Sequence, residues 1–290
     1  MSNRSGFRLG LVSGIISVLL ILGSLGSSCL GGSPGTRTPT NLANDPDEIE
    51  NRLRATIAIV DPETERIFCS GFFVSGRQII SAGHCFESSV PFVLPDGQVM
   101  QIPDGSDPTG QVVSFITYDD LDMITNRFLH APQQATIVYF DRNSDTVILE
   151  LNSPAQDSRY SFELSEARPR VGSQAYGIGH PLRLAWSFET GIVSRVIRNP
   201  ENGSIILLQA SVPVAGGNSG GPLIDSAGSV IGMALAYVNR LPHLSIFISA
   251  DQIRFHMRRL LVQRLITAYE ETQQRDRQRT PAISPPSSPD

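Results

Sequence analysis

Residues Gly216-Gly217-Asn218-Ser219-Gly220-Gly221-Pro222-Leu223 carry the strongest local signal in the chain, a serine set among glycines. A serine that acts as a nucleophile in acyl transfer needs an exposed hydroxyl and two backbone N–H groups aimed at the developing oxyanion. Glycines on both sides allow a tight loop and a close approach of the substrate. We therefore interpret Ser219 as a candidate nucleophile, and the N–H groups of Gly217 and Ser219 as candidate oxyanion donors. A glycine-rich hairpin turn that happens to contain a serine is the alternative.

A second stretch, Ile79-Ile80-Ser81-Ala82-Gly83-His84-Cys85, has the pattern of an apolar strand that ends in small residues and a histidine. A serine nucleophile needs a base within hydrogen-bond reach, and an imidazole suits that task near neutral pH. His84 is therefore the candidate base. An ordinary buried histidine at the end of a strand would give the same local pattern.

The third candidate is Asp145, which stands directly before the apolar stretch Thr146-Val147-Ile148-Leu149. A carboxylate at the start of a buried strand needs a partner, and orienting His84 would provide one. Asp141 is the rival. We favour Asp145 because it abuts the strand, whereas Asp141 lies in a polar turn.

Around these motifs, residues 52–250 contain many short segments rich in β-branched and aromatic residues and separated by turn clusters. The expected strands cover residues 56–60, 67–74, 78–81, 112–117, 136–140, 146–151, 173–178, 187–197, 204–211, 229–237 and 244–249. Many short strands without intervening helices favour an all-β barrel or sandwich. Because residues 154–170 are polar and poor in strand signals, we expect one β-barrel at 52–160 and a second at 161–250.

The apolar period changes after residue 250. Apolar residues repeat there at helical spacing, at Ile253, Met257, Leu260, Leu261, Leu265 and Ile266. This pattern predicts a C-terminal helix at 251–271 that packs on the body, with its arginines on the solvated face. The polar, proline-rich residues 272–290 are predicted to be a disordered tail.

Residues 1–36 have the pattern of an export segment. Arg4 and Arg8 precede an apolar run without charges and then small residues, as in a secretory signal. The run is also long enough to span a bilayer as a helix, and Cys29 offers a site for lipid attachment. Each alternative predicts a periplasmic, extracellular or membrane-anchored protein with its bulk outside the cytoplasm. Residues 37–51 lack periodicity and are interpreted as a linker.

Charge and cysteine content restrict the interpretation further. The net charge of −5 gives no electrostatic case for nucleic-acid binding. Cys69 and Cys85 are the cysteines of the folded part, and they flank a strand-like stretch. In an oxidising compartment such a pair predicts a disulfide. Two reduced core cysteines are the alternative.

The order His84, Asp145, Ser219 and the motifs around the first and last of them resemble the trypsin/chymotrypsin superfamily of serine proteases. Other segments are similar to its HtrA/Deg branch: Gly177-Ile178-Gly179-His180-Pro181, Thr190-Gly191-Ile192-Val193-Ser194 and Phe247-Ile248-Ser249. The resemblance covers about residues 54–250. It implies two perpendicular antiparallel β-barrels of the chymotrypsin-like fold, with the active site in the cleft between them.

The resemblance also implies details of that architecture. The pair Cys69 and Cys85 looks like the disulfide that brackets the catalytic histidine in animal-type members. In a departure from the HtrA/Deg pattern, no PDZ domain is expected after the C-terminal helix. From the residues themselves, His180 is expected in a Gly-His-Pro turn, and a role as a ligand or acid-sensing residue is the alternative.

The activity implied by the resemblance is a serine endopeptidase that forms an acyl-enzyme on Ser219 and acts on polypeptides. In this superfamily the base of the substrate pocket comes from residues about six before the serine. The corresponding residues here are Pro213, Val214 and Ala215, with Leu235 and Ala236 on a wall strand. No acid stands among them, so cleavage after small or medium apolar residues is predicted. No cofactor or metal is expected.

Two other function classes remain open. One is a scaffold or binding protein on a protease fold with a blocked cleft, because fold does not guarantee function. The other is an esterase or different acyl transferase that uses the same three residues. The oligomeric state is left open.

Overall fold

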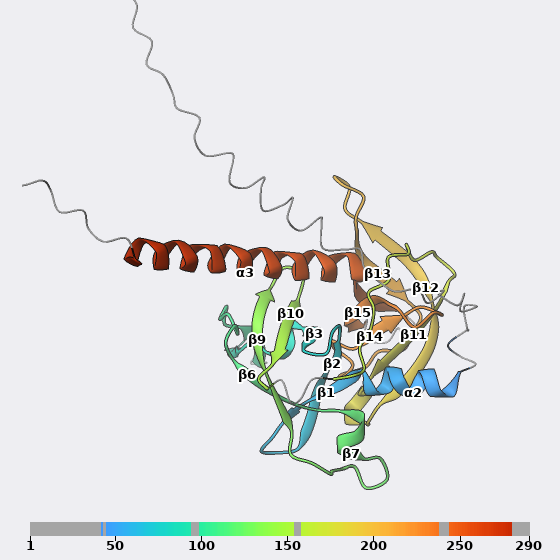
Figure 1. Cartoon of the computed structure of the whole chain (residues 1–290). Coiled ribbons are helices and arrows are strands. Elements are labelled where there is room, and N and C mark those ends of the chain that lie inside the picture. Colours follow the sequence, from blue (N-terminus) through green and yellow to red (C-terminus); the bar gives the residue numbers. More distant parts are fainter. Residues whose placement is uncertain (1–41, 43–44, 94–98, 154–157, 238–243, 280–290) are drawn as a thin grey trace, which may run out of the picture. The chain divides into compact units, whose positions relative to one another are not determined.

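The computed structural model describes residues 42, 45–93, 99–153, 158–237 and 244–279 (Figure 1). The predicted export segment at 1–36 with Cys29, the first part of the predicted linker, and the chain beyond residue 279 lie outside the described residues. Among the helices that are described, none is both long and apolar enough to cross a membrane.

Six antiparallel strands of the first half close into a barrel in the order β1-β2-β3-β10-β9-β6. Their bounds are β1 (Thr56–Asp61), β2 (Arg66–Phe73), β3 (Gln78–Ala82), β6 (Val112–Ile116), β9 (Gln133–Asp141) and β10 (Thr146–Leu151). β-Branched and aromatic side chains suit the pleated surface of a buried strand. Ile59, Phe115 and Val147 are examples, and all three are fully buried in the core of this barrel.

A second antiparallel barrel closes in the order β11-β12-β13-β16-β15-β14. Its strands are β11 (Gln174–Gly179), β12 (Ser187–Arg198), β13 (Ile205–Ala210), β14 (Pro222–Ile224), β15 (Val230–Tyr237) and β16 (Ser245–Ser249). Two antiparallel barrels followed by a C-terminal helix confirm the predicted all-β, chymotrypsin-like fold. Strand β14 is not among the expected strands, because it is short and begins inside the glycine-rich segment that contains Ser219.

An apolar cluster joins the two barrels. Phe72 of the first barrel and Met233 of the second are both fully buried in it. The indole N–H of Trp186, just before β12, donates to the carbonyl oxygens of Leu53 at 3.0 Å and Thr56 at 3.2 Å. The barrels are therefore tied by packing and by hydrogen bonds from one buried ring.

Several short elements in the connections are not predicted by the sequence. They are the strand pairs β4 (Ser89–Val93) with β5 (Val99–Pro103) and β7 (Leu121–Asp122) with β8 (Arg127–Phe128), and the 3-10 turns η2 (Gly83–Cys85), η3 (Tyr118–Asp120) and η5 (Pro181–Arg183). Two of these turns matter for the site, because η2 contains His84 and η5 begins directly after His180.

Helix α2 (Pro46–Arg54) begins inside the segment that the sequence analysis interprets as a linker. The side chain of Asp45 caps the helix by accepting the N–H of Glu48 at 3.1 Å, and Pro46 occupies the first turn. None of the helical residues is fully buried. The two apolar residues of α2, Ile49 and Leu53, pack against the core, but two apolar positions in a short polar segment do not stand out from a linker.

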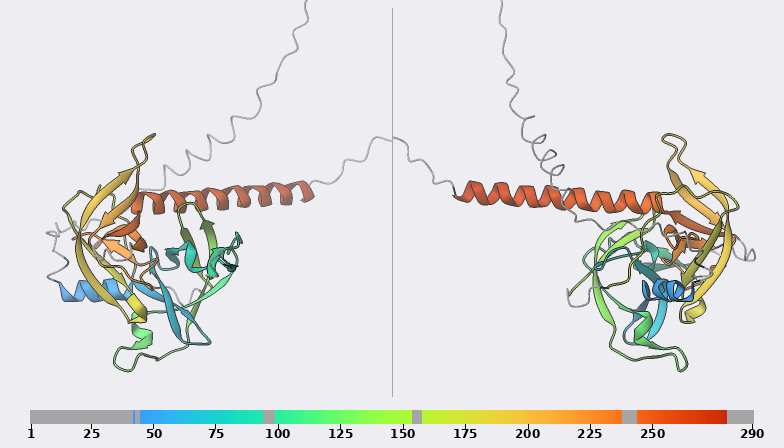
Figure 2. Two further views of the ribbon diagram at one scale, coloured as in Figure 1. Left: turned by 180° about the vertical axis from the view of Figure 1, so that it is seen from behind. Right: turned by 45° about the vertical axis from the view of Figure 1, so that its right-hand side comes forward.

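Helix α3 (Ala250–Arg279) extends past the predicted end at residue 271, into the segment predicted as a disordered tail. Glutamine and arginine continue the helix there through their helical propensity, and residues 272–276 are exposed. Figures 1 and 2 show α3 leaving the second barrel and passing over the β9–β10 hairpin of the first. Tyr139 Oη lies 2.9 Å from His256 Nδ1, and Arg264 pairs with Glu150 at 2.7 Å, so both helix residues contact the first barrel.

Cys69 of β2 and Cys85 of η2 form a disulfide, in agreement with the prediction from their positions. The bond closes a loop with a sequence separation of 16 residues. It fixes the residue that directly follows His84.

Replacing Cys69 and Cys85 together by alanine is expected to lower the free energy of unfolding by about 3 kcal/mol, because a loop of this size restricts the unfolded chain. Urea denaturation of the oxidised protein and of the double variant measures this difference. Reduced wild type is the control, and it should unfold with the variant. Equal stability of all three proteins would contradict the expectation.

Candidate active site

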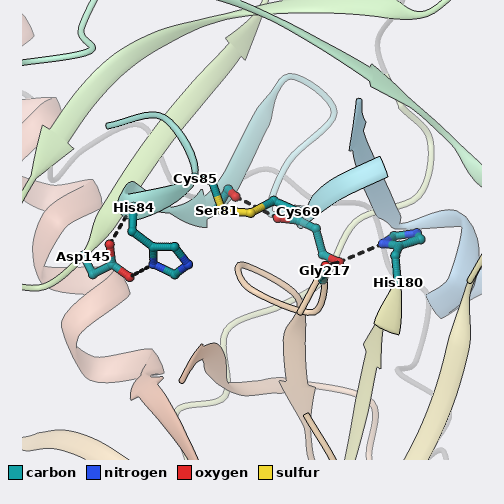
Figure 3. Close-up of a disulfide and its surroundings, with 8 residues drawn as sticks. Cys69, Ser81, His84, Cys85, Asp145, His180 and Gly217 are labelled. Atoms are coloured by element: carbon teal, nitrogen blue, oxygen red, sulfur yellow. Dashed lines mark hydrogen bonds and ion pairs between the residues drawn. A yellow bond between two sulfur atoms is a disulfide. The ribbon is translucent and has the colours of Figure 1, made fainter. Parts of the chain in front are cut away.

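Two hydrogen bonds join His84 to Asp145 (Figure 3). The Nδ1 atom of His84 lies 2.6 Å from Asp145 Oδ2, and the backbone N–H of His84 donates to Asp145 Oδ1 at 2.6 Å. An ionised carboxylate only accepts hydrogen bonds, so Nδ1 carries the ring hydrogen and Nε2 is left as the basic nitrogen. The carboxylate thus fixes both the orientation and the tautomer of the imidazole.

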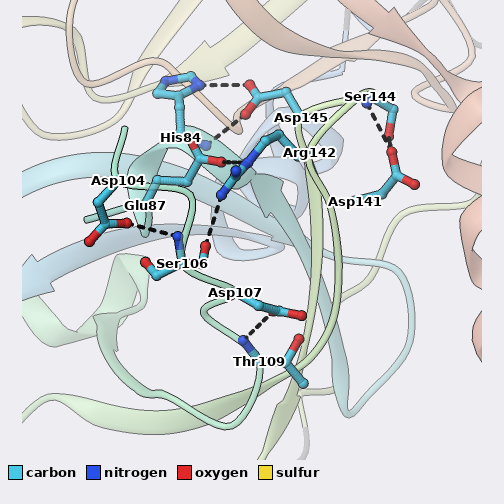
Figure 4. Close-up of polar contacts among 10 residues, drawn as sticks. All are labelled: His84, Glu87, Asp104, Ser106, Asp107, Thr109, Asp141, Arg142, Ser144 and Asp145. Carbon is cyan, nitrogen blue, oxygen red and sulfur yellow. Dashed lines mark hydrogen bonds and ion pairs between the residues drawn. The ribbon is translucent and has the colours of Figure 1, made fainter. Parts of the chain in front are cut away.

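The turn between β9 and β10 holds Asp145 in place. Asp145 has a φ of 51°, in the left-handed region that aspartate tolerates better than most residues. Arg142 of the same turn pairs with Glu87 at 2.7 Å and donates to the carbonyl oxygen of Ser106 at 2.9 Å (Figure 4). The turn is therefore tied to the segment that follows His84.

The rival candidate, Asp141, has other partners. Its Oδ1 accepts the N–H of Ser144 at 3.0 Å and the hydroxyl of Ser144 at 2.9 Å (Figure 4). Its Oδ2 lies 3.5 Å from Arg259 of α3. The structure brings Asp145 to His84 and uses Asp141 to close the turn.

The loop of Ser219 is packed against the strands that lead to His84. The N–H of Ser70, in β2, donates to the carbonyl oxygen of Ser219 at 2.8 Å. Gly220 has a φ of +84°, and a Cβ there would lie 2.2 Å from Ser70 O and 2.4 Å from Ser81 Oγ. Only a glycine fits this contact. The half-buried Ser219 is thereby placed beside the end of β3, which lies two residues before His84.

All five carbonyl oxygens of residues 215–219 accept hydrogen bonds. Their donors, in chain order, are the N–H of Asn218 at 3.0 Å, the N–H of Leu182 at 2.7 Å, the hydroxyl of Ser70 at 2.7 Å, the N–H of Gly221 at 2.9 Å and the N–H of Ser70 at 2.8 Å. Within the described part of the chain, the N–H groups of Gly217 and Ser219 donate to nothing. Two free donors beside a serine are the arrangement that an oxyanion requires.

The predicted pocket residues do not all meet in one cavity. Pro213 and Val214 line a cavity of about 10 Å³ together with Asn218, which is room for about one water molecule. Ala215, Leu235 and Ala236 do not line it. Leu235 instead packs against the apolar cluster between the barrels, so the predicted side-chain preference stays a prediction.

Sequence reasoning missed the residues that hold the loop of Ser219 from outside. The hydroxyl of Ser70 lies 2.7 Å from Nδ1 of His180, besides donating to Gly217 O. Arg142 likewise has no sequence signal beyond its place in the polar turn after Asp141. Such partners are far apart in the chain and carry no local sequence pattern.

Burial lowers the pKa of the His84 imidazole, but the hydrogen bond and charge of Asp145, with a smaller contribution from Glu87, outweigh it and raise the pKa above the ordinary histidine value. The protonated ring is stabilised because it faces a carboxylate. His84 therefore stays protonated to a higher pH than a free histidine.

Titration of the His84 ring by NMR is expected to give a pKa above the ordinary value of about 6.5. Asp145→Asn should lower the pKa from its wild-type value, because the opposing carboxylate is lost. Asp141→Asn is the matched control, and it should leave the pKa raised. Equal effects of the two substitutions would contradict the assigned pairing.

The family described as "Trypsin-like peptidase domain" matches residues 69–233, more than half of the chain. Protease Do-like 1, chloroplastic, of Arabidopsis thaliana is 29% identical over 151 residues, which are 48% of this chain and 34% of that protein. The probable periplasmic serine endoprotease DegP-like of Brucella suis is 28% identical over 143 residues, 44% of this chain and 28% of that protein. The chain thus spans about a third of the length of these curated relatives.

Solved structures support the fold. The serine endoprotease from Yersinia pestis superposes with a TM-score of 0.52 at 17% identity, covering 73% of this chain and 64% of that chain. The active form of the Rv3671c protease from M. tuberculosis gives a TM-score of 0.54 at 18% identity, covering 80% and 94%. Since the family match also includes the segments of His84, Asp145 and Ser219, the chain belongs to the trypsin-like peptidase family.

Proposed function

We propose that the protein is a serine endopeptidase that hydrolyses peptide bonds in polypeptides, with Ser219 as nucleophile, His84 as base and Asp145 as the residue that orients the base. The observation that carries the proposal is the pair of hydrogen bonds from His84 to Asp145, 2.6 Å each. These two hydrogen bonds leave Nε2 of His84 as the basic nitrogen of the ring. His84 lies in the first barrel, and the loop of Ser219 is hydrogen-bonded to that barrel through the N–H of Ser70.

The reaction follows from the placement of these groups. Oγ of Ser219 attacks the carbonyl carbon while Nε2 of His84 takes the hydroxyl proton, and Asp145 stabilises the resulting imidazolium. The N–H groups of Gly217 and Ser219 bind the negative oxygen of the tetrahedral intermediate. His84 then gives its proton to the leaving amine as the C–N bond breaks.

The second half of the reaction releases the acyl group from the serine. His84 takes a proton from a water molecule, and the oxygen of that water attacks the ester carbonyl carbon. The same two N–H groups hold the oxyanion. When the ester bond breaks, the proton passes from His84 to Oγ of Ser219, and the free enzyme is restored.

Two finer features belong to the proposal. The predicted pocket residues include no acid, which is the basis for proposing cleavage after small or medium apolar residues, and Glu189 is the acid that also lines the cavity at Pro213 and Val214. A location outside the cytoplasm is supported by the export pattern at residues 1–36. It is also supported by relatives that are named as periplasmic proteins, such as the DegP-like protein of Brucella suis.

The full chain and its Ser219→Ala variant, incubated with casein and with a fluorophosphonate probe, test the function. We expect the wild type to cleave and to be labelled, and the variant to do neither, because the probe reacts with an activated serine hydroxyl. Labelling with cleavage of esters but not of casein would favour the esterase alternative. A folded wild type that is neither labelled nor active would favour the scaffold alternative.

The value of kcat/KM for a peptide substrate is expected to rise with pH along a limb whose midpoint lies above about 6.5, the ordinary histidine pKa. The sign follows because the base must be neutral, and the pKa of His84 is raised by Asp145. In Asp145→Asn the limb should move to lower pH, and kcat should fall by about 10³- to 10⁴-fold. Stopped assays between pH 5 and 9 with constant ionic strength measure both effects, and an unmoved limb in that variant would contradict the assignment.

A further inference from the structure

We propose that Ser70 and His180 are positioning residues for the oxyanion hole, which act through the carbonyl oxygen of Gly217. Ser70 belongs to β2 of the first barrel, while His180 and Gly217 belong to the second. The inference rests on the proposed peptidase function.

The hydroxyl of Ser70 connects the other two residues. Its Oγ lies 2.7 Å from the carbonyl oxygen of Gly217 and 2.7 Å from Nδ1 of His180. Figure 3 shows the ring of His180 directed toward the loop of Gly217. A hydroxyl has one hydrogen and a carbonyl oxygen can only accept, so the hydrogen of Ser70 goes to Gly217 and Nδ1 of His180 donates to Ser70.

The surroundings of His180 favour the same tautomer. The ring is fully buried and meets the indole of Trp186 edge-on, with centroids 4.5 Å apart. Burial lowers the pKa of His180 to about 3, so the ring is neutral at pH 7 and has one N–H. Its Nε2 has no hydrogen-bond partner in the described structure. A buried lone pair is tolerated better than a buried N–H without an acceptor, which again places the hydrogen on Nδ1.

Hydrogen bonds hold the two peptide planes that flank Gly217. Leu182 of the second barrel holds the plane before Gly217, and Ser70 holds the plane after it. The carbonyl oxygen of Gly216 accepts the N–H of Leu182 at 2.7 Å. In a trans peptide the N–H points opposite to the carbonyl, so the N–H of Gly217 points away from Leu182. The next peptide plane is fixed by the hydroxyl of Ser70, through Gly217 O.

Gly217 needs such external support because of its own conformation. Its φ is +102°, and a Cβ at this position would lie 2.2 Å from the carbonyl oxygen of His180. No side chain can therefore be placed here to limit rotation of the peptide planes, and glycine has the widest conformational freedom. Without the hydroxyl of Ser70, the plane after Gly217 keeps only the hydrogen bond from the N–H of Asn218 to the carbonyl oxygen of Ala215. The conformation of Gly217, and with it the direction of the oxyanion donor, is then less well defined.

Ser70 also contacts the nucleophile by its backbone, and that contact would survive substitution. Its N–H donates to the carbonyl oxygen of Ser219 at 2.8 Å. Ser70→Ala therefore removes the hydroxyl alone and leaves the main-chain link between the barrels. This makes the hydroxyl's effect on Gly217 measurable by itself.

The test compares Ser70→Ala, His180→Leu and His180→Asn in the full chain. The amide nitrogen of asparagine stands two bonds from Cβ, as Nδ1 of histidine does, so His180→Asn keeps a donor. We expect Ser70→Ala and His180→Leu to lower kcat by about 10- to 100-fold, less than the loss of a whole oxyanion donor, with KM within about twofold of wild type. His180→Asn should retain most of kcat, and the double variant Ser70→Ala/His180→Leu should lose no more than the worse single variant.

A peptidyl boronic acid provides a second readout, because its tetrahedral adduct needs the oxyanion donors. Its inhibition constant should rise in proportion to the loss of kcat/KM in Ser70→Ala. Ser249→Ala is the matched control, since Ser249 is a buried serine whose hydroxyl donates to the carbonyl oxygen of Ile205 in the second barrel. It should lower the melting temperature like Ser70→Ala but leave kcat unchanged.

Several outcomes would overturn the inference. If folded Ser70→Ala keeps kcat within about threefold of wild type, or if Ser249→Ala loses kcat equally, Ser70 has only a structural role. If Ser70→Ala does not fold, the two His180 variants decide: equal kcat in His180→Leu and His180→Asn would show that the donor at residue 180 does not act on the oxyanion hole. A wild type that is neither labelled by fluorophosphonate nor active would overturn the proposed function together with the inference. An active wild type with unaffected variants would overturn the inference alone.

Discussion

A main-chain hydrogen bond of 2.8 Å, from the N–H of Ser70 to the carbonyl oxygen of Ser219, joins the two barrels at the candidate site. The proposed base and its orienting carboxylate lie in the first barrel, and the proposed nucleophile lies in the second. Acyl transfer needs these groups within hydrogen-bond reach, so the site depends on how firmly the barrels are held together. Gly220 permits this contact, because any Cβ at its position would overlap Ser70 and Ser81.

Ion pairs of charged residues hold the turn that contains Asp145 in place next to His84. Arg142 and Glu87 tie the turn of Asp145 to the segment that follows His84, and Arg259 of α3 pairs with Asp141 in that turn. These pairs are partly exposed, and such pairs individually add little stability. Their contribution is geometric, because they restrict a turn whose carboxylate must stay 2.6 Å from the imidazole.

Much of the fold could be predicted because its signals are local. Runs of β-branched and aromatic residues mark the long strands, and each expected strand corresponds to a strand of one of the two barrels. The sequence does not reveal strand β14 and helix α2 and misplaces the end of α3. Strand β14 has only three residues, α2 has only two apolar residues on the core, and residues 272–276 of α3 are exposed. The candidate residues His84, Asp145 and Ser219 stood out because each combines an unusual residue type with a strand end or a glycine-rich loop.

The contacts that hold the site could not be predicted in the same way. Ser70 and His180 are separated by 110 positions, and Ser70 and Gly217 by 147, so no local pattern relates them. The sequence places His180 in a turn, and it does not show that the ring is fully buried and hydrogen-bonded. The substrate pocket is harder to predict from the sequence than these contacts, because it depends on side chains of several segments. The cavity at Pro213 and Val214 has room for about one water molecule.

A crystal structure of the protein treated with a peptidyl boronic acid would test the central claim most directly. The account predicts a covalent bond between boron and Oγ of Ser219, with one boronate oxygen about 2.7–3.1 Å from the N–H nitrogens of both Gly217 and Ser219. It also predicts His84 between that adduct and Asp145. An adduct on another residue, or an oxygen at Ser219 that neither N–H reaches, would contradict it.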